Sequence, residues 1–592
     1  MVVGTAVGTI YLVLGCLQFR PIGPFDTSHL PGTIFGGPAT GDPPPLVWYL
    51  EWTTYAARHL LNPFFSTLIN APYGANLTPN TSMPLLGLLG APFTLTLGPI
   101  ATYNVLIRLA LAASAAAMYL LLREWVGPVP SFVGGLIYGF GPWTVSQALV
   151  HLDLAWAAIP PLIIWASVRC ARGSFSPRRS GVLIGALVAA QMYVTAEIDL
   201  LILLSVGAAA LILANRSRHL ITDLRKRILN ASPWFLGTFL LLTGYWIWSL
   251  LFGPGHISGP PQPSAVLQIY HSDLLSPFVP TFNQWLHPWW VGGRAMQYVG
   301  GNVTENAGYV GIPLAALFVL VMIARRHDRV VTTSGMVALA AFVLSLGPRL
   351  TVNGRTTAIP LPEAVLARIP FIRDIVPARF AMMVLLFVTL SVVVGSVRVW
   401  EMLEMAPVRS FAISVSAIGM VVAVAAALLF VVPARSGESA GTWPEDTLST
   451  LSRLPAGATV LTYPYPTFLI DAAMTWDAQL GLRFRLLGGY VTQSSGRGAP
   501  TFIPPLLAPS SVIEYFTEDI SNYYPPPPSV SKTQRDLCVF LRRYHVGGVI
   551  VWAIGSRGIL VRRLVTSALG PPTTTTRDGS IAVWRVGSRC QP

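Results

Sequence analysis

Long apolar runs recur along the chain, and they constrain its fold more than any other feature. A membrane-spanning helix needs about 20 mostly apolar residues to cross roughly 30 Å of hydrocarbon. Runs close to that length follow one another through most of the 592 residues, of which 53% are hydrophobic and only 11% are charged. Soluble proteins carry about 25% charged residues. Most of the surface therefore faces something other than water, and the sequence predicts a polytopic α-helical membrane protein.

About eleven of these runs are interpreted as spans. They are Val2–Phe19, Ala101–Leu122, Ser131–Val150, Leu154–Val168, Gly181–Thr195, Leu200–Ala214, Trp234–Phe252, Ala307–Ala324, Val331–Leu346, Phe380–Val397 and Phe411–Val432. Pro84–Gly98 is apolar but short for a span. Leu46–Leu61 has helical periodicity with Trp48, Trp52 and Tyr55, which predicts a helix at the membrane surface.

The basic residues indicate an orientation. The net charge is +14, and nearly all of it is arginine clustered between apolar runs, a pattern that fits membrane topology better than nucleic-acid binding. With the assigned spans, the clusters from Arg123 to Arg409 fall on one side, which the positive-inside rule makes the cytosol. The first loop has few basic residues, which favours the outside and leaves Pro84–Gly98 at the surface. We therefore expect a plasma-membrane protein with a cytosolic N-terminus and an extracytoplasmic C-terminus.

The chain changes character after the last predicted span. Residues 1–432 are expected to form the multispan domain, with a large first outer loop over residues 20–99, and residues 433–592 an extracytoplasmic α/β domain. In the tail, Ala458–Pro466, Val546–Ile554 and Ser580–Val586 read as strands bounded by Gly and Pro, and Asp536–Tyr544 and Ile559–Leu569 read as helices. Pro525–Pro528 reads as a stiff exposed loop. Cys538 and Cys590 can form a disulfide if this domain lies outside the cytosol.

Several motifs are missing from the sequence. It has no P-loop, which argues against ATP-driven transport by this chain. It also has no Gly-x-Ser-x-Gly elbow, no Gly-x-Gly-x-x-Gly after a strand, and no Cys or His spacing typical of zinc sites. The informative residues are instead charged groups at the predicted outer boundary: Asp42, Glu51, His151, Asp153, Glu197 and Asp199. Ionisable groups at span ends are costly to bury and often functional, although each also fits a solvated helix cap.

The first 220 residues or so resemble a known enzyme family. A first span, an outer loop with an early Asp, a surface helix, and then Asn80–Gly98 leading into Ala101–Gly127 resemble the N-terminal half of GT-C glycosyltransferases. Later segments, Glu305–Pro313 and Leu346–Pro362, are similar to the YfhO-like group of multispan proteins. The resemblance implies a GT-C-like fold and an inverting transfer of a sugar from a polyprenyl-phosphate donor to a cell-envelope glycan or lipid acceptor on the outer face.

The resemblance also implies roles for single residues. It makes Asp42 the catalytic base, with Asp26 as the competing candidate, although the acidic pair common in this loop is absent and three prolines follow Asp42. Arginine is well suited to hold the donor phosphate, and Arg379 is the first choice, with Arg349 next. The groups expected to orient the acceptor or bind a cation are His151, Asp153, Glu197 and Glu305.

Two other functions stay open at this point. One is a transporter or flippase for a lipid-linked precursor, for which Gln147 and Gln191 are the mid-span polar candidates. The other is a partner in envelope assembly with no catalytic activity, which the missing acidic pair favours. In each case the expected partners are membrane lipids and lipid-linked glycans rather than nucleic acid, and the metal requirement is left open.

Overall fold

The chain folds into two compact units in the computed structural model. Unit 1 comprises Met1–Arg20, Ile107–Gly244 and Gln262–Ser436; unit 2 comprises Pro21–Leu106, Tyr245–Pro261 and Gly437–Pro592. The structure describes residues 2–32, 40–216, 218–261, 268–295, 297–298, 304–404, 424–426, 428–429, 432, 443–467, 470–494, 500–501, 510–517 and 530–587. The predicted span Phe411–Val432 lies almost entirely outside the described residues, and Pro525–Pro528 lies outside them altogether.

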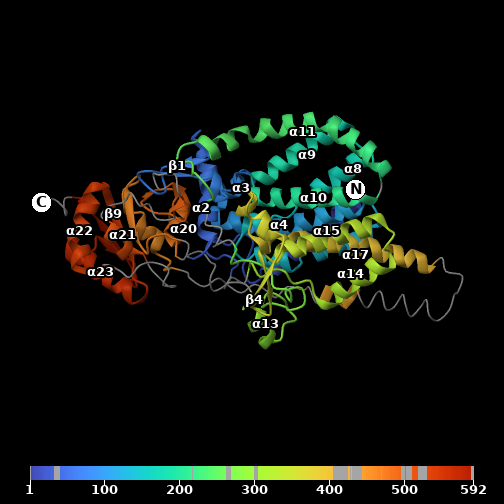
Figure 1. Cartoon of the computed structure of the whole chain (residues 1–592). Helices are drawn as coiled ribbons and strands as arrows, with labels where there is room; N and C mark the ends of the chain where they lie inside the picture. Colours follow the sequence, from blue (N-terminus) through green and yellow to red (C-terminus); the bar gives the residue numbers. More distant parts are fainter. Residues whose placement is uncertain are drawn as a thin grey trace. The chain divides into compact units, whose positions relative to one another are not determined.

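Unit 1 is helical (Figure 1). Its helices up to the middle of the chain are α1 (Val2–Gln18), α4 (Pro99–Leu122), α5 (Pro128–Gly139), α6 (Pro142–Gln147), α7 (Leu152–Ala155), α8 (Ile159–Ala171), α9 (Pro177–Met192), α10 (Ala196–Arg216) and α11 (Arg218–Phe252), of which α4 and α11 run on into unit 2. The later elements are α13 (Trp289–Ala295), α14 (Ile312–Ala324), α15 (Arg329–Ser345), the hairpin β3 (Arg349–Val352) and β4 (Arg355–Pro360), α16 (Glu363–Leu366), η2 (Ile372–Asp374), η3 (Pro377–Phe380) and α17 (Ala381–Glu404).

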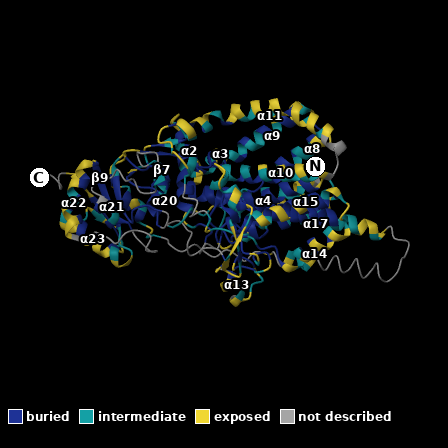
Figure 2. Cartoon of the chain, in the orientation of Figure 1, coloured by how far each residue is buried: buried dark blue, intermediate teal, exposed yellow. Residues whose placement is uncertain are grey.

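Within the described part of the chain, five helical segments are long and apolar enough to cross a membrane: Pro99–Leu122, Leu152–Ala171, Ala196–Asn215, Thr222–Phe252 and Pro377–Glu404. Figure 2 shows that they differ in surroundings, since α17 is mostly buried by other helices while α11 is largely exposed. An exposed apolar helix is stable in contact with lipid but not with water. Together with the shorter apolar helices α1, α3 (Pro84–Leu97), α14 and α15, these segments make the chain a membrane protein.

Several details of the predicted spans were wrong, and two of them concern candidate residues or a clear helix break. Ser131–Val150 is not one helix, because the chain breaks between α5 and α6 at Phe140–Gly141, where Pro142 then begins the next helix. Proline cannot continue a helix but is well tolerated in the first turn of a new one. The second detail concerns Glu197 and Asp199, which were expected in an outer turn. They lie in the first turn of α10, where the partial positive charge of a helix N-terminus favours carboxylates.

Unit 2 is built on a five-stranded sheet in the order β10-β11-β9-β5-β6. Its strands are β5 (Thr459–Tyr463), β6 (Arg485–Leu486), β9 (Val546–Trp552), β10 (Thr574–Thr575) and β11 (Ile581–Arg585). β5 is parallel to both β6 and β9, while β11 is antiparallel to β9 and β10. The predicted strands near residues 459, 546 and 581 are thereby confirmed. The accompanying helices are α19 (Thr447–Leu451), α20 (Ala472–Gln479), α21 (Ser510–Phe516), α22 (Val530–Arg543) and α23 (Gly555–Leu569).

The core of this sheet consists of alternating apolar residues. Val549 and Val551 on β9 and Trp584 on β11 are buried together with Tyr463 on β5. Inward-facing residues two positions apart are what the period of a strand requires. Cys538 on α22 packs against this core and is disulfide-bonded, whereas Cys16 and Cys170 are free. Cys590 lies outside the described residues, so its pairing with Cys538 stays a prediction.

The first loop also belongs to unit 2. It contains α2 (Pro43–Arg58), the short strands β1 (Phe65–Ser66) and β2 (Ala75–Asn76), η1 (Thr78–Asn80) and α3; two further short strands, β7 (Gln493–Ser494) and β8 (Pro500–Thr501), come later in the chain. A helix predicted over Leu46–Leu61 is present as α2, but its Trp48 and Trp52 are buried within the protein, and its place at the membrane surface stays a prediction. It packs against both α3 and α20. The contact with α3 is close, because a Cβ on Gly87 would come within 2.5 Å of Thr53.

Candidate functional site

The first group of predicted site residues meets in unit 1 around Arg379, at the start of the segment that continues into α17. Arg379 Nη1 donates a hydrogen bond to Glu197, and Nη2 donates to Glu305 Oε1 over 2.9 Å. Glu197 also accepts a 2.7 Å hydrogen bond from the backbone N–H of Val376. Asp153 acts on the Arg379 guanidinium electrostatically as well. Four segments far apart in sequence are thus held together by one guanidinium.

His151 joins this region through the neighbouring loop. Its Nδ1 lies 2.7 Å from Gln147 Oε1, so the ring N–H donates to the amide oxygen. Gln147 Nε2 in turn donates to the backbone carbonyl of Thr304 over 3.0 Å, next to Glu305 in the chain. Gln147, considered above as a mid-span transport residue, is therefore used to hold the loop that carries Glu305.

The charges around Arg379 do not match those expected of a phosphate site. One guanidinium faces the carboxylates of Glu197, Glu305 and Asp153, so the group as a whole carries excess negative charge when all are ionised. Its nitrogens are engaged by carboxylates, and a phosphate would have to displace one of them. Arg349 lies at the start of β3 and is exposed.

Asp42 occupies a distinctive position in unit 2, directly before α2. It is the N-cap residue of the helix and is half-buried, but its side chain makes no capping hydrogen bond. The reason lies in the sequence, since an N-cap carboxylate normally accepts from the N–H groups two or three residues on. Here those positions are occupied by Pro44 and Pro45, which have no N–H. The prolines thus remove the usual local partners of this carboxylate.

A second aspartate, Asp471, has the same position before α20. It is the N-cap residue there, also without a capping hydrogen bond, and is only 1% exposed. Neither of its carboxylate oxygens has a hydrogen-bond partner in the described part of the chain. Burial first, and then the neighbouring Asp42 charge, raise the pKa of Asp471 well above its usual range. The same two carboxylates act on the buried phenol of Tyr49, whose pKa is raised mainly by burial.

The packing of α2 on α20 explains why the two aspartates meet. Trp48 Nε1 on α2 donates to Asp477 Oδ2 on α20 over 3.3 Å. Trp48 lies six residues after Asp42, and Asp477 lies six residues after Asp471. Two helices joined at equal heights, with their first residues also interacting, run in the same direction. Their N-termini therefore lie side by side and bring the two N-cap carboxylates together.

Other buried acids follow along the same helices. Burial raises the pKa of Asp477 to about 7, against the lowering effect of hydrogen bonds from Phe484 and Trp48. Burial also raises the pKa of Glu51 to about 7, with Arg58 opposing it. The α2–α20 pair thus contains several carboxyl groups whose ionisation is made costly by removal from water.

Asp26, the competing base candidate, has a different environment. Its Oδ1 accepts from the backbone N–H groups of Ser28 and His29 over 2.7 and 2.8 Å, and its Oδ2 lies 3.0 Å from the His29 ring. Partial burial raises the pKa of Asp26, but these hydrogen bonds outweigh it and hold the pKa below the usual range. A carboxylate stabilised in its charged form is a poor proton acceptor.

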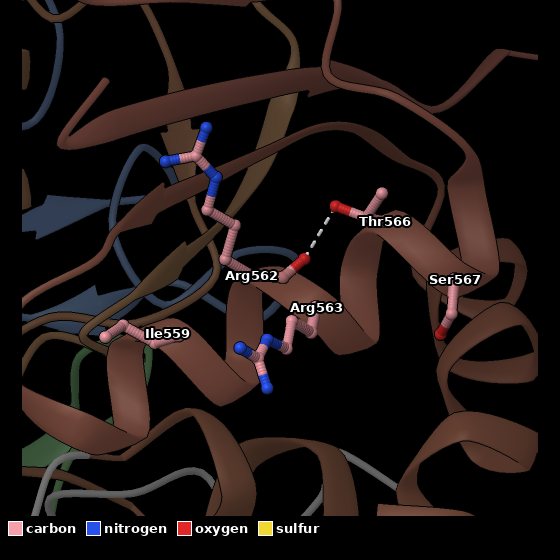
Figure 3. A pocket seen from close by; sticks show the side chains of 5 residues that line it. All are labelled: Ile559, Arg562, Arg563, Thr566 and Ser567. Atoms are coloured by element: carbon pink, nitrogen blue, oxygen red, sulfur yellow. Dashed lines mark hydrogen bonds between the residues drawn. The ribbon is translucent and has the colours of Figure 1, made fainter. Parts of the chain in front are cut away.

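Sequence reasoning missed Asp471. The signal was present, because an Asp directly before the helical stretch Ala472–Gln479 fits an N-cap, but nothing local indicates which other helix it faces. The described part of the chain holds no group of three or more His, Cys, Asp or Glu residues arranged to bind a metal ion. A surface hollow on α23 is lined by Ile559, Arg562, Arg563, Thr566 and Ser567 (Figure 3). It has no carboxylate that could accept a proton.

The chain was compared with known proteins. The model of the family described as Domain of unknown function (DUF6311) matches residues 16–431, which is more than half of the chain. Curated proteins gave no match by sequence.

Among solved structures, the arabinofuranosyltransferase AftD from mycobacteria is similar, with a TM-score of 0.53 and 16% identity over 99% of this chain and 40% of that one. A mutant of AftD has a TM-score of 0.51 and 15% identity, over 99% of this chain and 41% of that one. An oligosaccharyltransferase from Archaeoglobus fulgidus has a TM-score of 0.49 and 11% identity, over 93% of this chain and 69% of that one. The chain spans about two fifths of the length of AftD. It shares the fold of that enzyme, which is the GT-C glycosyltransferase fold expected from the sequence.

Proposed function

We propose that this chain, which belongs to the family described as Domain of unknown function (DUF6311), is an inverting membrane glycosyltransferase of the GT-C type. In this proposal it transfers a sugar from a polyprenyl-phosphate donor to a cell-envelope glycan or lipid acceptor on the outer face of the plasma membrane. The observation that carries the proposal is the environment of Asp42. It combines the position that a GT-C base would have in the first loop with a buried acidic neighbour, Asp471.

The chemistry follows from that environment. The oxygen of an acceptor hydroxyl attacks the anomeric carbon and forms the new glycosidic bond, while the bond from that carbon to the phosphate oxygen breaks. The electron pair leaves with the polyprenyl phosphate, and the hydroxyl proton passes to Asp42. Asp26 is unsuited to this role because its oxygens already accept hydrogen bonds from Ser28 and His29.

The donor phosphate needs a cation that is accessible to it. Arg349 is exposed, and arginine can bind two phosphate oxygens at once. Arg379 is proposed to act differently, since its guanidinium is already shared by Glu197 and Glu305. In this proposal Arg379 and the residues around it, including Asp153 and His151, fix the loops of unit 1 rather than contact the phosphate.

Two experiments test the proposal. The first compares lipid-linked glycans from cells with and without the gene, and we expect a glycan to be lost and restored by the wild-type gene. The second measures transfer by purified protein in nanodiscs, using the polyprenyl-phosphate sugars extracted from the same cells and labelled in the sugar. Asp42→Asn should lower turnover by roughly 10²–10⁴-fold, the usual contribution of a general base, without lowering the protein level.

The matched control is Asp26→Asn, which should leave turnover within a few fold of wild type. If Asp26→Asn abolishes transfer and Asp42→Asn does not, the base is Asp26. If both variants transfer as well as wild type, neither residue is the base. If the deletion leaves every lipid-linked glycan unchanged, the flippase and assembly-partner functions replace this proposal.

A further inference from the structure

Asp471 is a buried carboxyl group with no assigned partner. Burying a polar group without a hydrogen bond is unfavourable, and burying an isolated charge is more so, so a buried carboxyl usually becomes neutral. Asp471 is 1% exposed, and neither oxygen has a hydrogen-bond partner within the described residues. A residue that only stabilised α20 would be expected to cap its N–H groups, and Asp471 does not.

The neighbour that Asp471 faces is the proposed base. The Trp48–Asp477 hydrogen bond sets α2 and α20 in parallel, so Asp42 and Asp471 stand at equal heights, about 9 Å below that bond at 1.5 Å per residue. Two facing carboxylates repel each other when both are charged, and the pair is most stable with one proton between them. The more buried member holds that proton, and here it is Asp471.

We propose that Asp471 is a positioning residue for Asp42: its neutral carboxyl donates its O–H to one oxygen of Asp42 and leaves the other oxygen to take the proton of the acceptor hydroxyl. This inference rests on the proposed function, and it adds a residue from the C-terminal part of the chain to the site. No second proton is needed, because the proton on Asp471 stays in place while the acceptor proton moves to Asp42. The raised pKa of Asp471 agrees with a neutral group.

The surroundings allow this arrangement. The Tyr49 phenol faces both carboxyl groups and stays neutral, because burial raises its pKa. Glu51 and Asp477 are the other acids on these two helices. The sequence of α3, on the other side of α2, has no titratable side chain.

The test is the pH dependence of kcat/KM for purified full-length protein in nanodiscs, with labelled polyprenyl-phosphate sugar from the source cells. Wild-type activity should fall at high pH, as Asp471 loses its proton and becomes a second negative charge beside Asp42. Asp471→Asn should abolish this alkaline fall, because an amide N–H donates at every pH, and should keep activity within a few fold at lower pH. Asp471→Ala should lose roughly 10–100-fold at every pH, as expected for one hydrogen bond to a charged group.

Asp477→Asn is the matched control on the same helix. Asp477 accepts from Trp48 and from the Phe484 N–H, so this variant should be less stable yet keep the alkaline fall. An alkaline fall that survives in Asp471→Asn, or full activity in Asp471→Ala, would overturn the inference. Absence of any transfer by wild type would instead count against the proposed function.

Thermal unfolding provides a test that needs no turnover. A carboxyl whose folded pKa lies above its unfolded value of about 3.9 destabilises the folded protein as pH rises above that value. Asp471→Asn should therefore melt at a higher temperature than wild type at pH 8, and the difference should shrink toward pH 4. A lower melting temperature at pH 8 would mean that Asp471 is charged and stabilised by partners, contrary to the inference.

Discussion

In unit 1 the carboxylates of Glu197 and Glu305 share the guanidinium of Arg379, whereas in unit 2 the carboxyl of Asp471 faces Asp42 and has no hydrogen-bond partner among the described residues. Glu305 and Asp471 are buried, whereas Glu197, Arg379 and Asp42 are partly buried. All of them except Glu305 lie where the chain begins a helix. The first places a guanidinium between its carboxylates and is suited to hold segments in place. The second leaves a carboxyl uncompensated, which costs stability, and such costs are retained mainly where a group is needed for chemistry.

The largest effect on stability is expected from removing the Arg379 cation of unit 1. Arg379→Met removes the cation and leaves two buried carboxylates facing each other, so the free energy of unfolding should fall by about 3–5 kcal/mol. The measurement is unfolding of the purified protein in detergent. Arg349→Met is the control, because an exposed arginine should change stability by no more than about 0.5 kcal/mol. If Arg379→Met keeps normal stability and loses only donor affinity, Arg379 is the phosphate ligand that the sequence predicted.

A smaller effect is expected from loosening the contact that aligns the two aspartates. Trp48→Phe removes the donor to Asp477 and should cost about 1–3 kcal/mol of unfolding free energy. It should also reduce turnover, because α2 and α20 are no longer held at the same height. Trp52→Phe provides the control: it loses a comparable hydrogen bond, to the Pro63 carbonyl, but not the contact with α20. Equal turnover in the two variants would argue against alignment as the role of Trp48.

The pH dependence of stability should have opposite signs at Asp26 and Asp471. The folded pKa of Asp26 is depressed, so its contribution to stability is present above the unfolded pKa of about 3.9 and is lost as pH falls below that value. Asp26→Asn should therefore lower the melting temperature at pH 7, and the difference from wild type should shrink as pH falls below about 3.9. Melting curves recorded across that pH range measure the difference. An Asp26→Asn variant with unchanged stability at pH 7 would contradict the expected difference in sign between Asp26 and Asp471.

The mildest test asks on which side of the membrane each segment lies. Reporter fusions after Asn70 and Ser452 should report the outside, and fusions after Arg172 and Arg326 the cytosol. A cytosolic signal at Asn70 would mean that Pro84–Gly98 crosses the membrane and that Asp42 lies on the wrong face for a polyprenyl-phosphate donor. The structure describes α3 as a helix of 14 residues, about 21 Å long at 1.5 Å per residue and short of the roughly 30 Å hydrocarbon layer.

Local sequence patterns predicted the helices and strands better than they predicted which residues contact one another. Apolar runs identified α4, α10 and α17, and short stretches bounded by Gly and Pro identified β5 and β9, because both signals are local to each segment. The break at Phe140–Gly141 was missed although Gly141 and Pro142 indicate one. Glu197, Glu305 and Arg379 were each singled out, but not as a group, since Arg379 lies 182 residues from Glu197 in the chain.

Asp471 shows more clearly what the sequence could not predict. The contact that places it beside Asp42 joins residues 429 positions apart, and no local propensity carries that information. The sequence indicated the absence of an acidic pair in the first loop. In our proposal, the second acid is Asp471, which is 429 positions after Asp42 in the chain.

The prolines after Asp42 have a consequence for how the proposed base is held. Each proline fixes its own φ near −65° and restricts the residue before it, so the turn from Asp42 into α2 has few backbone conformations to lose on folding. A reactive carboxylate must be held in a fixed orientation. Here the stiffness of Pro43, Pro44 and Pro45 fixes the backbone that carries Asp42, in addition to the O–H that Asp471 is proposed to donate.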